Sequence, residues 1–299
     1  MPDIQQDKIE FRSNYQVVRL AEGGVAKLHY IENWRSQTTS AEKTLIFIHG
    51  LGANCHVWRP LIATLTTLNP NVRCVALDLP GHGKSSSFDN ASMLAYLSSI
   101  DKFIETLNGG SFHLIGHSFG AALLMHSDRN PLHTARIMSY YLIAPVGIQK
   151  LTQWQKNLIK TVYDLSFLNK MGKKGSYESF CKYFANYQPE FDSIWAFIEP
   201  NIDKNPVRYF HTIHLLANSV MDVYELKVPT IFEPTHFIIG RNDLVVPARA
   251  FGKQVTVDDL KRINQSLFPN SNWHFIDNCG HYPQIEHHQQ VSHLIISTL

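Results

Sequence analysis

A five-residue segment, Gly116-His117-Ser118-Phe119-Gly120, constrains the fold of this chain more than any other. It follows an apolar run at 112–115 and precedes a helix-like run at 121–125. A strand that passes directly into a helix must turn very sharply, and the backbone of the central serine is strained there. Glycines two positions before and after the serine remove side chains that would collide. The pattern therefore predicts a strand–turn–helix unit with the serine projecting from the turn.

The rest of the chain alternates strand-like and helix-like segments. Apolar runs that predict strands lie at 16–20, 25–30, 44–48, 72–77, 112–115, 140–143, 236–239 and 273–276, the first two forming a hairpin. Continuous apolar strands separated by helix-length segments predict an α/β fold with a mostly parallel sheet and helices on both faces. Reactive groups of such sheets gather at the carboxyl ends of the strands.

One long segment, 146–227, shows no strand pattern and is helical in character and rich in aromatic residues. We predict two parts, a core made of residues 1–145 and 228–299 and a helical cap made of residues 146–227. Most aromatic side chains of the cap should pack within it, and a minority should line a pocket over the site. Within the cap, residues 172–176 contain two glycines and are predicted to form a loop.

Composition excludes several classes of protein. The chain has 299 residues and a net charge of +2, which is too small a basic excess for nucleic-acid binding. The first eight residues lack the pattern of a secretory signal, and no run approaches the roughly 18 apolar residues of a membrane span. Four scattered cysteines favour reduced thiols and a cytoplasmic location. The expected partner is a small-molecule substrate, and the oligomeric state stays open.

Ser118 is the candidate nucleophile, and it requires a base to take its proton. The best candidate is His281, one of sixteen histidines, in a Gly-His turn after the last predicted strand. A carboxylate must then orient the histidine. Asp243, which follows the strand at 236–239, is favoured over Asp277, which is closer to His281 in sequence. The order Ser118, Asp243, His281 is one of the known orders of a serine–histidine–acid triad.

Two backbone N–H groups are candidates for an oxyanion hole. The first belongs to Phe119, directly after the serine, and the second to Leu51, in the glycine-rich loop 49–53 after a predicted strand. His49 is expected to organise that loop through hydrogen bonds.

Other patterns do not support nucleotide or metal sites. The segment 81–85 resembles a phosphate-binding loop, but the glycine required five residues before Gly83 is Asp78. A dinucleotide pattern starting at Gly50 would need a glycine where Cys55 stands. His287, His288 and His293 suit a solvated helix face better than a metal site. No cofactor and no metal are therefore expected.

Five blocks of this sequence resemble the α/β-hydrolase superfamily over nearly the whole chain: 49–52, 78–85, 116–120, 240–243 and Gly280-His281 with Glu286. The resemblance implies eight strands, the second antiparallel, and a helical cap after the sixth. It weighs against dehalogenases and epoxide hydrolases, which carry aspartate where Ser118 stands. Carbon–carbon bond hydrolases usually have Ser-Met-Gly-Gly, whereas Phe119 and Ala121 replace the methionine and the last glycine here.

The sequence therefore predicts a serine hydrolase that cleaves a carboxylic ester or thioester of a small-to-medium apolar substrate through an acyl-enzyme on Ser118. Two alternatives remain open at this stage. The same triad could cleave a carbon–carbon or amide bond, or the chain could be a small-ligand receptor that retains the hydrolase fold.

Overall fold

The computed structural model describes residues 9–20, 23–33, 43–87, 92–107, 110–126, 136–148, 151–223, 229–245 and 257–299. The first eight residues and the predicted cap boundary at 227/228 lie outside the described residues. Within the described ranges, no helix combines the length and apolar character needed to cross a membrane.

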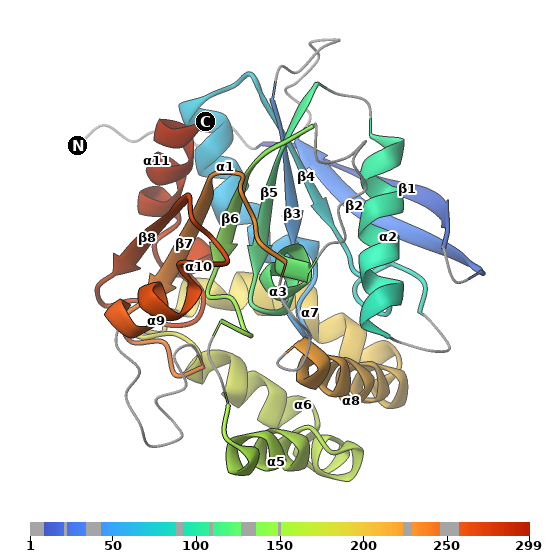
Figure 1. Cartoon of the computed structure of the whole chain (residues 1–299). Helices are drawn as coiled ribbons and strands as arrows, with labels where there is room; N and C mark the ends of the chain where they lie inside the picture. Colours follow the sequence, from blue (N-terminus) through green and yellow to red (C-terminus); the bar gives the residue numbers. More distant parts are fainter. Residues whose placement is uncertain are drawn as a thin grey trace.

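Eight strands form one sheet in the order β1-β2-β4-β3-β5-β6-β7-β8 (Figure 1). They are β1 (Phe11–Arg19), β2 (Val25–Asn33), β3 (Lys43–Ile48), β4 (Val72–Leu77), β5 (Ser111–His117), β6 (Ile137–Ile143), β7 (Thr235–Gly240) and β8 (Ser271–Ile276). β2 is antiparallel to both of its neighbours, and β4, β3, β5, β6, β7 and β8 run parallel to one another. The predicted mostly parallel sheet with an antiparallel second strand is confirmed.

Helices cover both faces of the sheet. They are α1 (Arg59–Leu68), α2 (Met93–Thr106), α3 (Phe119–His126), α9 (Val257–Asn264), α10 (Pro283–Glu286) and α11 (His288–Thr298), with a short 3₁₀ helix η1 (Cys55–Trp58) before α1. Successive strand side chains point to opposite faces. Accordingly, Ile46 and Ile48 pack in the apolar layer that contains α2 and α3, whereas Leu45 and Phe47 pack in the layer that contains α1 and α11.

Four helices between β6 and β7 form the helical insert, residues 151–223. They are α5 (Gln153–Val162), α6 (Leu165–Lys182), α7 (Asp192–Lys204) and α8 (Pro206–Val223), with a short 3₁₀ helix η2 (Pro189–Phe191) before α7. In the chain, β6 precedes the insert and β7 follows it. The insert lies beyond the carboxyl ends of the parallel strands (Figure 1).

The predicted loop at 172–176 is wrong for residues 173–176, which are helical and belong to α6, but a break does occur at its first residue. The helix is broken only at Gly172, where φ is 60° and ψ is −164°. A glycine costs a helix about 1 kcal/mol relative to alanine. Leu168 and Phe180, on either side of the break, are buried against the apolar layer. Tertiary packing of this kind outweighs a local preference for a turn.

Candidate active site

Ser118 occupies the strained turn between β5 and α3, with a positive φ of 51°. Its backbone N–H donates to the carbonyl of Ile143, the last residue of β6, at 2.9 Å. A Cβ on Gly116 would lie 2.6 Å from the backbone of Ala121, and one on Gly120 would lie 2.3 Å from the carbonyl oxygen of Ile48. Both glycines are therefore required for the close approach of strand and helix, as the sequence pattern predicts.

The structure joins His281 to Asp243. Asp243 follows β7, and its Oδ2 lies 2.8 Å from Nδ1 of His281, with both side chains buried. Its Oδ1 accepts the N–H of Val245 at 2.7 Å. Since a carboxylate can only accept, Nδ1 of His281 carries a proton and Nε2 is left as a proton acceptor. This is the arrangement that a general base needs.

The alternative acid, Asp277, faces away from the site. Its side chain is 80% exposed and pairs with Arg241 at 2.7 Å. The tertiary structure thus distinguishes the two carboxylates, one buried against the histidine and the other in solvent.

The turn that carries His281 is bound to the helical insert. The N–H of His281 donates to the carbonyl of Tyr183 at 2.6 Å, just after α6. Glu286 bridges the same two segments, since its Oε1 accepts the N–H of Gly280 at 2.7 Å and its Oε2 accepts the N–H of Ala185 at 2.8 Å. The sequence showed Glu286 only as part of a family block, and its bridging role depends on the insert folding back onto this turn.

His117 makes a contact that the sequence did not reveal. Its Nε2 lies 2.8 Å from the backbone oxygen of His281, so Nε2 carries the proton and donates. Burial holds the pKa of His117 well below its ordinary value, and the ring is neutral. Among the described residues, none forms a hydrogen bond with Nδ1 of His117. The residue directly before the candidate nucleophile, Ser118, is therefore hydrogen-bonded to the backbone of the candidate base, His281.

The glycine-rich loop after β3 lies against Ser118, the candidate nucleophile. A Cβ on Gly50 would lie 3.1 Å from Cβ of Ser118. His49 shapes the loop as predicted, because its Nε2 accepts the N–H of Leu79 at 3.0 Å and its Nδ1 donates to the carbonyl of Gly50 at 2.8 Å. Burial lowers the pKa of His49, which keeps it neutral. The two predicted oxyanion donors, Leu51 and Phe119, directly follow the two residues that touch, Gly50 and Ser118.

A cavity of about 120 Å³ lies between the helical insert and the core. The core contributes Leu51 and Gly52 of the glycine-rich loop 49–53, and Tyr282, the residue directly after His281. Six aromatic side chains of the insert line it, namely Tyr163, Phe180, Tyr183, Trp195, Tyr209 and Phe210. The hydroxyl of Tyr209 donates to the carbonyl of Gly52 at 3.0 Å. A minority of the insert's aromatic residues thus line a pocket beside the site, as predicted.

One group of side chains with metal-ligand chemistry occurs in the described part of the chain, formed by His29, Cys55 and Asp78. Oδ1 of Asp78 accepts the N–H of Cys55 at 2.7 Å, and Oδ2 accepts from Nδ1 of His29 at 2.6 Å and from the N–H of Lys84 at 2.9 Å. Burial opposes ionisation of Asp78, but these hydrogen bonds and nearby histidines lower its pKa to about 2. The carboxylate is fully engaged in linking β2, the start of η1 and the loop 78–85.

Residues 45–294 match the model of a family described as the alpha/beta hydrolase family. The chain belongs to this family. This hydrolase is 24% identical to monoacylglycerol lipase ABHD6 of Rattus norvegicus over 274 residues, which cover 86% of the chain and 75% of the lipase.

Two further proteins resemble this hydrolase along nearly their whole length. It is 24% identical to a 2-hydroxy-6-oxononadienedioate/2-hydroxy-6-oxononatrienedioate hydrolase of Paraburkholderia phymatum, with 94% of each chain covered. The solved structure of a thermophilic esterase from Thermogutta terrifontis superposes with a TM-score of 0.69 at 17% identity, covering 95% of this hydrolase and 97% of the esterase. The structural similarity shows that the fold is shared.

Proposed function

We propose that this chain is a serine hydrolase that cleaves a carboxylic ester or thioester of a small-to-medium apolar substrate. The observation that carries the proposal is the buried Asp243–His281 hydrogen bond, 2.8 Å long, whose histidine is tied through His117 to the nucleophile turn. Burying an acid–base pair beside a strained, half-buried serine costs folding free energy. Such a cost is typical of sites where the serine must be activated for reaction.

Each residue of the site has a defined part in the reaction. Ser118 Oγ attacks the carbonyl carbon while Nε2 of His281 takes its proton, and Asp243 stabilises the resulting imidazolium. The backbone N–H groups of Leu51 and Phe119 bind the oxyanion. The alcohol or thiol leaves with the proton from His281. A water molecule, deprotonated by the same histidine, then releases the acid and restores Ser118.

The cavity supports an apolar substrate of limited size. Its wall is mostly aromatic, and its volume is about 120 Å³. A cavity of about 150 Å³ with apolar walls holds one benzene molecule. The cavity next to Leu51 is therefore suited to an acyl or alcohol portion of roughly four to six carbons.

The relatives support hydrolysis but point to two bond types. Their names describe a lipase and an esterase on one side and a hydrolase of a 2-hydroxy-6-oxo acid, a carbon–carbon bond substrate, on the other. Carbon–carbon bond cleavage is favoured by the alignment with the Paraburkholderia enzyme, which covers 94% of each chain. Phe119 and Ala121, which break the usual Ser-Met-Gly-Gly, favour ester cleavage for this chain.

The test compares the wild-type protein with Ser118→Ala. Both are treated with a fluorophosphonate probe and assayed with p-nitrophenyl esters of increasing acyl length and with a 2-hydroxy-6-oxo-dienoate. We expect labelling of Ser118, ester turnover that is fastest for short acyl groups, and a loss in kcat of about a thousandfold or more in Ser118→Ala.

Other outcomes would change the conclusion. Retention of ester turnover by Ser118→Ala overturns the proposal, and turnover of the dienoate alone assigns carbon–carbon cleavage instead. Labelling without turnover of either substrate, combined with strong thermal stabilisation by a ligand, would favour a receptor.

A further inference from the structure

The first two helices of the insert expose large apolar side chains to solvent. Trp154 and Val162 on α5 are 63% and 40% exposed, and Phe167 at the start of α6 is 46% exposed. Single exposed apolar residues are ordinary on a protein surface. Three within one short stretch of two consecutive helices make a surface that favours an apolar contact. In Figure 1, α5 lies at the end of the molecule farthest from the sheet.

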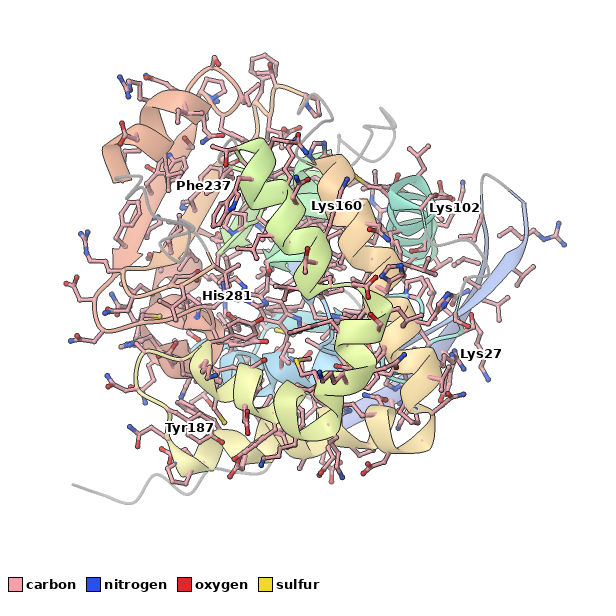
Figure 2. All side chains as sticks on the ribbon, turned by 90° about the horizontal axis from the view of Figure 1, so that it is seen from below. Lys27, Lys102, Lys160, Tyr187, Phe237 and His281 are labelled. Carbon is pink, nitrogen blue, oxygen red and sulfur yellow. The ribbon has the colours of Figure 1, made fainter. Side chains whose placement is uncertain are left out.

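The same stretch is strongly basic. Residues 151–182 contain six lysines and two acidic residues, a net charge of +4, whereas the whole chain carries +2. The rest of the chain therefore has a net charge of −2. Lys173 pairs with Glu199 and Asp203 of α7 at 3.1 and 3.0 Å. Lys160 and Lys170 are exposed, and Figure 2 looks onto this end of the molecule with Lys160 on α5.

The apolar surface continues into the cavity. Val162, half-exposed at the end of α5, is also one of the residues that line the cavity. Its neighbours in the cavity wall are Tyr163, which directly follows α5, and Leu168 and Met171 of α6. A hydrocarbon group resting on this surface would therefore have a continuous apolar path from Val162 toward Leu51 of the oxyanion loop.

We propose that the solvent side of α5 and of the start of α6, which carries Trp154, Lys160, Phe167 and Lys170 and is called here the docking face, binds an anionic lipid membrane. Basic helices with aromatic and aliphatic side chains adsorb at the boundary between headgroups and acyl chains. Each lysine close to an anionic surface contributes about fivefold in affinity. The net charge of −2 elsewhere orients the protein with this face toward the lipid. Delivery of an acyl chain to the cavity rests on the proposed function, but the docking itself does not.

The experiment uses full-length Ser118→Ala protein, so that no lipid is consumed, in sedimentation with phosphatidylcholine vesicles with and without phosphatidylglycerol. We expect binding to the anionic vesicles at low salt, weaker binding as salt is added, and at least tenfold weaker binding to the neutral vesicles. Absence of binding to anionic vesicles at low salt overturns the proposal.

Matched variants locate the contact. Trp154→Glu and the double variant Lys160→Glu/Lys170→Glu should each weaken binding at least tenfold. Phe232→Glu is the control, because Phe232 is 66% exposed and precedes β7, at the amino ends of the parallel strands. It should bind as tightly as the parent protein. Equal losses in Trp154→Glu and Phe232→Glu would also overturn the proposal.

Two further measurements keep the conclusions separate. Thermal unfolding followed by circular dichroism verifies that each variant is folded, and Trp154→Gln replaces Trp154→Glu if the latter is unstable. Vesicle binding without ester turnover in the wild-type protein would overturn the proposed function and leave the docking face. Ester turnover without vesicle binding would overturn the docking face and leave the proposed function.

Discussion

Replacing Asp243 with asparagine tests the central contact of the site with almost no change in shape. Asp243 Oδ2 accepts a proton-bearing Nδ1 from His281 at 2.8 Å, and Oδ1 accepts the N–H of Val245 at 2.7 Å. An asparagine side chain has only one oxygen for these two donors, and its NH₂ group must face the other. If the amide nitrogen faces His281, the ring must place its proton on Nε2, where it can no longer accept the proton of Ser118.

The burial of Asp243 and His281 determines how far kcat should fall in Asp243→Asn. Asp243 is 0% exposed and His281 is 4% exposed, so the imidazolium formed during attack would have no solvent to stabilise it. Removing one partner of a buried ion pair costs about 3–5 kcal/mol. At about 1.4 kcal/mol per tenfold change, kcat should fall by roughly two to four powers of ten.

Steady-state ester hydrolysis and the rate of fluorophosphonate labelling measure this effect. Asp277→Asn is the matched control, because Asp277 is the other carboxylate near His281 in sequence and pairs with Arg241 in solvent. It should leave kcat within about twofold, as expected of an exposed ion pair. Asp243→Asn with near-wild-type kcat, or Asp277→Asn with the larger loss, would refute the assignment of the acid.

Two other predictions concern His117 and acid stability. His117→Met removes the donor to the carbonyl of His281 and should lower kcat about tenfold with little change in KM. His117→Gln can still donate this hydrogen bond and should restore most of the rate. Equal kcat values for the two variants would exclude this positioning role. Burial lowers the pKa of His82 to about 3 and those of His126 and His236 to about 4 in the folded protein, so the unfolded chain binds more protons between about pH 4 and pH 6.5. The free energy of unfolding should therefore fall by about 1 kcal/mol per histidine for the first pH unit below about 6.5. Calorimetry should show a Tm that decreases from about pH 7.5 to about pH 5.5. A constant or rising Tm over this range would contradict this account.

Much of the framework could be predicted from the sequence because it depends on local rules. Central strands such as β3 and β5 were visible as continuous apolar runs, since strands buried on both faces carry few polar residues. The edge strand β1 is largely exposed, and only its second half, within 16–20, was predicted. The requirement for Gly116 and Gly120 follows from the tight strand-to-helix turn, and both would collide with backbone if they carried a Cβ. The loop predicted at 172–176 is reduced to a break at Gly172, because the burial of Leu168 and Phe180, which is not local information, stabilises helix on either side of it.

The sequence by itself determined which residues have the chemistry for the site and in what order they occur. Only the tertiary structure decided which of them meet. Asp243 and Asp277 are equivalent by residue type, and they differ because β7 ends beside His281 while Asp277 turns out to Arg241. His117 and Glu286 acquire their contacts from segments 164 and 101 positions away in the chain. Such contacts depend on how strands and insert pack together, and no local pattern of residues encodes that packing.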